Sequence, residues 1–362
     1  MEKEILIIRL SSIGDVLHCT PVARSLKLNW PGCRITWLVS AASADVIRYN
    51  PDIDACLVWS RERFEACLRA RDFSGAIALW RELKDLFSEK SFYAVLDIHG
   101  LFLTGVIARQ VKSERRIGMK GTKELNSWFM TETAAPLGGH KIDRYLGVLR
   151  KLGIERFDKS MVLVIPEAAR KNANNLISAA GRLAVLIPGT TWPAKNWPTV
   201  YFAAVAVLLA ADFTVVLAGG NAEKEIGDSI VSQVNVPILN LIGRTSLLEL
   251  AAVLERANVV VTGDTGPLYM AVTLGTPVVA MFGPTHPAVY GPRQGEYAIL
   301  EAGLPCSYCH KLRCPQGDNQ CMKKVKPEEV AAAVYRLTGI KERKEQDGVV
   351  GDFRKRIPRP LS

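Results

Sequence analysis

One aspartate stands where an apolar run gives way to a helical pattern. The segment RLSSIGDVLHCTPVAR, residues 9–24, directly follows the run ILII, and Asp15 is its only carboxylate. Thr20 and Pro21 form a typical pair of N-cap and first helical residue, so we expect a helix to begin there and Asp15 to lie in or near the preceding loop. A carboxylate on such a loop can act as a general base toward a hydroxyl group, or it can cap backbone N–H groups.

Two segments in the second half of the chain carry groups that suit an anion. IPGTTWPAKNWP, residues 187–198, places a glycine, two threonines and Lys195 just beyond an expected strand, although the spacing is not that of a P-loop. In VVVTGDTGPLYMAVTLGTPVVAMFGPT, residues 259–285, an expected buried strand ends at residues 263–267 and a helical pattern begins at once. Free N–H groups at such a helix start attract anions, and Asp264 and Thr265 can cap the helix or bind ligand hydroxyls. Both segments also have a structural interpretation, as a proline-rich loop and as a tight turn.

The sequence motifs of several other enzyme classes do not occur in this chain. No Gly-x-Gly-x-x-Gly follows the first apolar run, and no His-Glu-x-x-His or Gly-x-Ser-x-Gly element occurs. Four cysteines, Cys306, Cys309, Cys314 and Cys321, are spaced C-x2-C-x4-C-x6-C, which is compatible with a small zinc or iron–sulfur site or with free buried thiols. We predict no bound metal and no cofactor.

The elements that must position these residues follow an alternating pattern. Short β-branched apolar runs predict strands at residues 5–10, 34–39, 55–59, 93–98, 183–187, 213–218, 257–262 and 276–282. Continuous apolar runs with helical segments between them predict an α/β fold with parallel sheets buried on both faces. Ligands of such sheets bind beyond the carboxyl ends of the strands.

Two sheets fit the length of 362 residues. We expect an N-terminal Rossmann-like domain over residues 1–165, a C-terminal one over 180–340, a linker near 160–182, and a basic tail over 341–362. The loops of the two sheets would then face each other across a shared cleft.

The net charge of +10 favours an anionic partner. A nucleic-acid-binding function would rest on this charge alone, because no nucleic-acid motif accompanies it. No run of about 18 apolar residues could cross a bilayer, and residues 1–10 lack a signal-peptide pattern, so we expect a cytoplasmic protein.

Taken together, the motifs identify a resemblance. RLSSIGDVLHCTPV, PGTTWPAKNWP, GRTSLLELAAVLERANVVVTGDTGPLYMAVTLGTPVVAMFGPT and CSYCHKLRCPQGDNQCMKKVKPEEV resemble, in order and spacing, segments of the ADP-heptose:lipopolysaccharide heptosyltransferases, the bacterial glycosyltransferase family 9. The resemblance implies a GT-B fold, an ADP-sugar donor on the C-terminal domain, and a lipid-linked anionic saccharide acceptor on the N-terminal domain.

The resemblance also implies roles for individual residues. Asp15 matches the family's proposed catalytic base. Residues matching the donor-binding positions are Thr190, Thr191, Lys195, Glu223, Asp264, Thr265, Gly266, Pro267 and Leu268. His140 and Arg144 resemble residues on the acceptor side. Tyr269 stands where the family usually has histidine, and a neutral phenol cannot carry positive charge as imidazole can.

The implied activity is inverting transfer of heptose to the lipopolysaccharide inner core, on a protein bound peripherally to the cytoplasmic face of the inner membrane and not to nucleic acid. Two alternatives remain at this point. One is a family 9 enzyme with another nucleotide sugar or acceptor, and the other is a non-catalytic protein that binds a nucleotide sugar.

Overall fold

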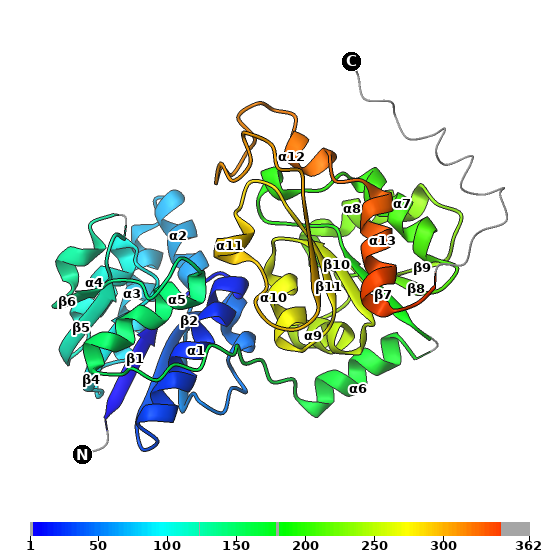
Figure 1. Cartoon of the computed structure of the whole chain (residues 1–362). Coiled ribbons are helices and arrows are strands. Elements are labelled where there is room, and N and C mark those ends of the chain that lie inside the picture. Colours follow the sequence, from blue (N-terminus) through cyan, green and yellow to red (C-terminus); the bar gives the residue numbers. More distant parts are fainter. Residues whose placement is uncertain (1–2, 123, 179–180, 342–362) are drawn as a thin grey trace. The chain divides into compact units, whose positions relative to one another are not determined.

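The chain consists of two compact units, residues 1–164 and 165–362. The computed structural model describes residues 3–122, 124–178 and 181–341 (Figure 1). The segment expected as a linker contains α6 (Glu167–Leu176), which packs on α9 (Leu247–Arg256) within the second unit. The expected basic tail, apart from residue 341, lies outside the described residues.

The first unit is built on one six-stranded parallel sheet with the strand order β3-β2-β1-β4-β5-β6. Its strands are β1 (Glu4–Ile8), β2 (Arg34–Ser40), β3 (Ala55–Trp59), β4 (Phe92–Asp97), β5 (Ser113–Met119) and β6 (Glu132–Ala134). Its α-helices are α1 (Ile13–Asn29), α2 (Arg61–Arg69), α3 (Phe73–Asp85), α4 (Phe102–Gln110) and α5 (Lys141–Leu146), and its 3₁₀ helices are η1 (Ala41–Val46), η2 (Asn126–Phe129) and η3 (Gly147–Leu152).

The second unit repeats this architecture, with the order β12-β11-β10-β7-β8-β9. Its strands are β7 (Leu183–Ile187), β8 (Thr214–Leu217), β9 (Ile238–Asn240), β10 (Val259–Gly263), β11 (Val278–Phe282) and β12 (Tyr297–Glu301). Besides α6 and α9, its helices are η4 (Pro193–Lys195), α7 (Thr199–Leu209), η5 (Asn221–Glu223), α8 (Lys224–Ser232), α10 (Gly266–Thr273), α11 (Pro287–Tyr290), α12 (Gln320–Lys323) and α13 (Pro327–Thr338).

Both sheets reverse their strand order at one point, between β1 and β4 in the first unit and between β7 and β10 in the second. Such a reversal is where open α/β sheets bind their ligands, because the connections leave the two central strands in opposite directions. The first reversal lies beside Asp15 and the second beside Lys195 and Asp264. The fold therefore brings each predicted motif to the position in its sheet that is best suited to hold a ligand.

The predicted α/β class with two parallel sheets is confirmed, and each of the eight predicted strands is present. Four further strands, β5, β6, β9 and β12, were not predicted. β5 has the sequence SERRIGM, and its two arginines interrupt the apolar pattern. In the structure, Arg115 of this strand is paired with Glu132 of β6 at 2.8 Å. The other three lie at or next to a sheet edge and bury fewer side chains.

The prediction for the start of α1 is wrong. The helix begins at Ile13, two turns before Pro21, and Asp15 lies in its first turn instead of in a loop. Ser12 is the N-cap, and the N–H of Val16 donates to its carbonyl at 2.8 Å. The overlooked signal is the spacing of Ser12 and Asp15, since a serine cap followed three residues later by an acid marks a helix start.

Pro21 is tolerated inside α1 because its neighbour replaces the missing donor. A proline at position 21 leaves the carbonyl of Leu17 without its helical N–H partner. The hydroxyl of Thr20 donates to that carbonyl at 2.8 Å, and its oxygen accepts the N–H of Val162 at 2.9 Å. One buried hydroxyl thus satisfies two backbone groups.

We expect Thr20→Val to lower the free energy of unfolding by about 2 kcal/mol or more, because it leaves a buried carbonyl and a backbone N–H without partners. Urea unfolding followed by circular dichroism measures this change. Thr214→Val is the matched control, since the Thr214 hydroxyl makes no hydrogen bond within the described residues. Equal stability of the two variants would contradict the explanation of Pro21.

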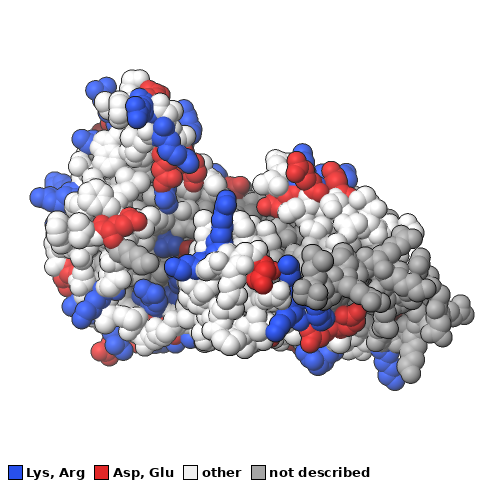
Figure 2. All heavy atoms as spheres, turned by 90° about the horizontal axis from the view of Figure 1, so that it is seen from above, with Lys and Arg blue, Asp and Glu red and all other residues white. Residues whose placement is uncertain are grey.

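Charge and hydropathy add two observations. On the face shown in Figure 2, Lys and Arg side chains are interspersed with Asp and Glu side chains, so that face presents no single basic surface of the kind that nucleic acid would require. Within residues 3–122, 124–178 and 181–341, no helix combines the length and the apolar character that a membrane span needs.

Candidate functional site

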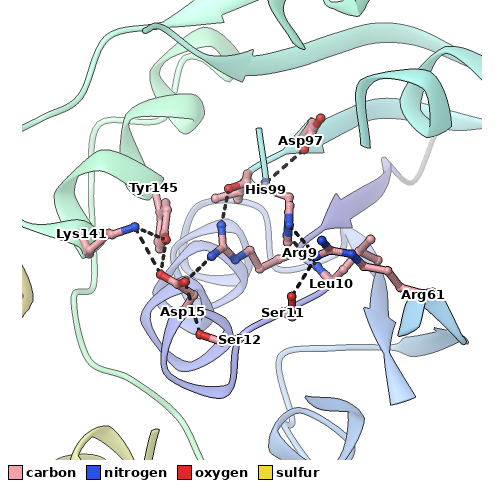
Figure 3. Close-up of polar contacts among 11 residues, drawn as sticks. Arg9, Leu10, Ser11, Ser12, Asp15, Arg61, Asp97, His99, Lys141 and Tyr145 are labelled. Carbon is pink, nitrogen blue, oxygen red and sulfur yellow. Dashed lines mark hydrogen bonds and ion pairs between the residues drawn. The ribbon is translucent and has the colours of Figure 1, made fainter. Parts of the chain in front are cut away.

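The carboxylate of Asp15 is the centre of a polar network in the first unit (Figure 3). One oxygen lies 2.6 Å from Nη2 of Arg9 and 3.4 Å from the hydroxyl of Ser12. The other accepts the phenol of Tyr145 at 2.7 Å and lies 3.4 Å from Nζ of Lys141. The Asp15 side chain is 25% exposed, so part of it remains accessible.

Backbone geometry holds these partners in place. Arg9 directly follows β1, is buried, and donates through Nη1 to the carbonyl of Ile98 beyond the neighbouring strand β4 at 3.0 Å. Lys141 and Tyr145 lie four residues apart on α5, which packs on α1, so they share one helix face. Among the described residues, the partners of Asp15 are side chains, which is not the arrangement of a backbone cap.

These contacts fix the charge state of Asp15. Burial by itself raises the pKa of the carboxyl group, but the charges of Arg9 and Lys141 and the hydrogen bond from Tyr145 outweigh it, so the pKa lies well below its usual range. Asp15 is therefore ionised at physiological pH, and as a base it is weaker than an ordinary aspartate.

His99 lies on the other side of Arg9. Its Nδ1 accepts the N–H of Leu10 at 3.2 Å, and its Nε2 lies 3.1 Å from Nη1 of Arg61. Burial, with the charges of Arg9 and Arg61, lowers the pKa of His99 to about 2, so the ring is neutral. A neutral imidazole accepts at only one nitrogen, so the tautomer of His99 decides whether Leu10 or Arg61 is its donor.

The two residues expected on the acceptor side differ in their environment. His140 is 2% exposed and caps α5, since its Nδ1 accepts the N–H of Ile142 at 3.2 Å. The structure thus gives His140 a structural contact. Arg144 is half-buried on α5, between the two residues of this helix that contact Asp15, and its side chain forms no ion pair within the described residues.

Asp264 is the centre of a second network, in the second unit. Its carboxylate lies 2.7 Å from Nζ of Lys195 and accepts the hydroxyl of Thr285 at 2.7 Å and the phenol of Tyr269. The Asp264 and Lys195 side chains are only 4% and 13% exposed. The buried carboxylate therefore holds the ammonium group at the end of η4, beside the ring of Trp192, whose centroid is 4.5 Å from Nζ.

Three other expected donor residues come from two loops. The Thr190 hydroxyl contacts the carbonyl of Trp192 at 2.8 Å and Oδ1 of Asn196 at 2.7 Å, which fixes the turn before Lys195. Glu223 lies against Gly189, where a Cβ would approach its Cγ to 2.1 Å, so only glycine allows this contact. The structure thus brings Glu223 to the loop that carries Thr190, while Thr191 is exposed.

The remaining expected donor residues form the start of α10. Thr265 is the N-cap and Gly266 and Pro267 open the helix, and all three are partly exposed. Leu268 is fully buried and its N–H donates to the carbonyl of Thr265 at 3.1 Å, so this residue supports the helix start from within the core. The helix start lies directly after Asp264, which places its N–H groups near the Lys195 ammonium.

The four-cysteine segment supports the loops of this second network. The carbonyl of Leu312 accepts the N–H of Ala194 at 3.2 Å, and the Asn319 amide donates to Pro193 at 2.9 Å. The N–H of Tyr308 donates to Gly283 at 2.9 Å, close to Thr285. The four thiols, all free, line one small cavity, and within the described residues no group of three or more His, Cys, Asp or Glu side chains is arranged to hold a metal ion.

Several members of the two networks were not predicted from the sequence. These are Arg9, Arg61, His99, Lys141, Tyr145 and Thr285. Three of them stand just after the apolar runs that form β1, β4 and β11, so their position at a carboxyl strand end was a usable signal. The others reach the networks from helices and could not be identified by spacing.

Known proteins share both the sequence and this architecture. The model of glycosyltransferase family 9 (heptosyltransferase) matches residues 77–319. The lipopolysaccharide core heptosyltransferase OpsX of Haemophilus influenzae is 24% identical, over 92% of this chain and 97% of its own. Lipopolysaccharide heptosyltransferase 1 of Pseudomonas aeruginosa is 27% identical, over 86% of this chain and 87% of its own.

Solved structures agree in fold. A glycosyl transferase family 9 protein from Veillonella parvula superposes with a TM-score of 0.81 and 26% identity, over 94% of this chain and 99% of that one. The E. coli heptosyltransferase WaaC with ADP has a TM-score of 0.70 at 22% identity, over 93% and 99% of the two chains. Because the family match spans well over half of the sequence, this chain belongs to glycosyltransferase family 9, the heptosyltransferases, and is a glycosyltransferase.

Proposed function

We propose that this glycosyltransferase moves heptose from ADP-L-glycero-D-manno-heptose to the lipid-linked inner core of lipopolysaccharide, with inversion at the anomeric carbon. The observation that carries the proposal is that each unit has a charged site at the point where its sheet reverses strand order. The first holds the ionised carboxylate of Asp15, and the second holds the ammonium of Lys195 on Asp264.

The second network suits the donor diphosphate. Asp264 holds the ammonium group of Lys195 in place, and the start of α10 adds backbone N–H groups. Cations and helix starts stabilise the negative charge that develops on a departing diphosphate. Structures of the E. coli heptosyltransferase WaaC contain ADP or ADP-2-deoxy-2-fluoro heptose, which supports the same class of donor here.

The first network suits the acceptor. In the proposed step, an acceptor hydroxyl oxygen attacks the anomeric carbon, the bond from that carbon to the ADP oxygen breaks, and the hydroxyl proton moves to Asp15. A carboxylate of lowered pKa is a weak base, so the proton transfers as the new bond forms, when the hydroxyl becomes acidic. Arg9, Lys141 and Tyr145 keep the carboxylate ionised and fixed until then.

An anionic acceptor is supported by Arg61 and His99. The Arg61 guanidinium lies 3.1 Å from Nε2 of the neutral His99 and brings positive charge close to the carboxyl end of β1, which favours an anionic group on the ligand. Such an acceptor is attached to lipid, so we place the enzyme at the cytoplasmic face of the inner membrane as a peripheral protein.

The direct test incubates the purified enzyme with ADP-heptose and with each of two lipopolysaccharide inner-core acceptors, Kdo-lipid A and heptosyl-Kdo-lipid A, and detects the product by mass spectrometry. ADP-glucose and GDP-mannose are the matched donors that should give no product. Transfer from either of these instead of ADP-heptose would identify a family 9 enzyme with another donor. Tight ADP-heptose binding without turnover on any acceptor would favour a non-catalytic binding protein.

The charge state of Asp15 predicts a pH dependence. We expect kcat/KM for the acceptor to stay nearly constant from pH 8 down to about pH 5, because Asp15 remains ionised and His99 neutral over this range. Removing both Lys141 and Tyr145 contacts, in Lys141→Gln/Tyr145→Phe, raises the pKa of Asp15, so activity is lost at a higher pH than in the wild type. Lys159→Gln is the control, since Lys159 pairs with Asp143 at 2.8 Å and not with Asp15. An unchanged acidic limb in the double variant would contradict the assignment of Asp15 as base.

A further inference from the structure

Three large apolar side chains are exposed together in the first unit. Phe102 begins α4, Leu125 caps η2, and Trp128 lies within η2; they are 49%, 52% and 76% exposed. The carbonyl of Leu125 accepts the N–H of Trp128 at 3.0 Å, so these two exposed side chains belong to one tight turn. The ring of Phe102 contacts that of Phe129, also in η2, at a centroid distance of 5.2 Å. We call Phe102, Leu125 and Trp128 the apolar patch.

The apolar patch is held firmly in its exposed position. Asn126, between two of its members, is fully buried and donates to the Asp97 carboxylate at 2.7 Å and to the carbonyl of Leu101 at 2.8 Å. The N–H of Phe102 donates to Glu124 at 3.3 Å. Because Asn126 faces inward, the neighbouring side chains of Leu125 and Trp128 are turned toward solvent. Exposed clusters of large apolar side chains mark surfaces that bind a partner.

Positive charge adjoins the apolar patch. The Arg116 guanidinium donates to the carbonyl of Phe129 at 2.9 Å, and burial and the nearby charge of Arg109 lower the pKa of Arg116. Within the described residues, neither arginine forms an ion pair. The acid in contact with the patch is Glu124. Two adjacent guanidinium groups without a carboxylate suit an anionic surface.

The apolar patch is also tied to the proposed acceptor site. It follows β4 and β5 at their carboxyl ends, the edge of the sheet where Asp15 lies. The buried carboxylate of Asp97 accepts the N–H groups of His99 and Gly100 with one oxygen and the Asn126 amide with the other. One side chain therefore fixes both the His99 segment and η2.

We propose that the apolar patch, together with Arg109 and Arg116, is the surface on which this enzyme docks to an anionic phospholipid bilayer. Tryptophan and aliphatic side chains insert at the level of the headgroups, and the guanidinium groups meet lipid phosphates. With few inserted side chains the contact is weak and reversible. The biological purpose, presenting a lipid-linked saccharide to Asp15, rests on the proposed function.

The test is sedimentation of the full-length protein with vesicles of phosphatidylethanolamine and phosphatidylglycerol. We expect Leu125→Ser/Trp128→Ser to weaken binding at least about tenfold, because two apolar side chains that become buried in the bilayer are lost. Arg109→Gln weakens it about fivefold and only on anionic vesicles, not on phosphatidylcholine alone. The control is Phe73→Ser, which removes a side chain that is 63% exposed on α3. Wild-type binding by the double variant, or an equal loss in the control, overturns the proposal.

Two further measurements separate this proposal from its alternatives. Turnover with a soluble, deacylated acceptor should be the same in the double variant and the wild type. If the wild type transfers no heptose but vesicle binding depends on the apolar patch, the proposed function fails and the docking surface stands. If the double variant changes the oligomeric state in sedimentation velocity instead of vesicle binding, a second copy of the chain covers the patch and the proposal is wrong.

Discussion

Asp15→Asn is expected to lower kcat by about 10³-fold while ADP affinity stays within about twofold. General base catalysis contributes about 10²–10⁴ in rate, and an amide cannot take the proton of the acceptor hydroxyl. The residues proposed to bind ADP belong to the second unit and make no contact with Asp15 in either network. Steady-state kinetics and calorimetric titration with ADP measure the two quantities on the same preparation.

Asparagine is the suitable replacement because it preserves the network around position 15. Its amide oxygen can keep the contact with Arg9, and its nitrogen can donate to the Tyr145 hydroxyl, which also accepts. The control is Asp45→Asn, which alters a surface pair with Arg48 at 2.9 Å. If Asp15→Asn retains more than about a tenth of the wild-type kcat, another group takes the proton, since a missing base costs at least about 10²-fold.

The strands could be predicted because both faces of the central ones are buried. The residues of β1 from Ile5 to Ile8 are all fully buried, and such a run has few alternatives to a central parallel strand. β5 shows the limit of this rule. Its arginines are paired with Glu132 and with backbone carbonyls, and these partners stand 13 to 36 residues further along the chain.

The start of α1 was misplaced because two local signals compete. Thr20 and Pro21 have the residue types of a helix start, yet Ser12 and Asp15 are the pair that the structure uses. The hydroxyl of Thr20 allows Pro21 to lie inside the helix. It hydrogen-bonds to the carbonyl of Leu17 and to the N–H of Val162, which is 142 residues away. No local pattern contains that contact.

The candidate site likewise contains residues that could be predicted from the sequence and residues that could not. The residues after β1, β7 and β10 lie close to the carboxyl ends of these strands, because a strand end and the sequence after it remain neighbours in any fold of this class. Their partners arrive through the fold, as with Tyr145, which is 130 residues from Asp15. The structure explains the tyrosine at position 269, where the family usually has histidine. Its phenol donates to Asp264 and so holds the carboxylate that binds Lys195.

Lys195→Met is expected to lower kcat/KM for the donor by about 10²- to 10³-fold, because one charged group that stabilises the departing diphosphate is lost. The same change leaves the 4%-exposed side chain of Asp264 without its cation, and removing one partner of a buried pair costs about 3–5 kcal/mol. A loss of activity could then reflect unfolding. The single variant cannot separate these two causes.

The double variant Lys195→Met/Asp264→Asn separates them. With both charges removed, Tyr269 and Thr285 can still hydrogen-bond to the amide at position 264, so most of the thermal stability should return. Activity should not return, because no ammonium group faces the diphosphate. Thermal unfolding and donor kinetics on the wild type, the single and the double variant decide the matter. Recovery of both stability and turnover would mean that Lys195 only balances the charge of Asp264, and the donor site would then lie elsewhere.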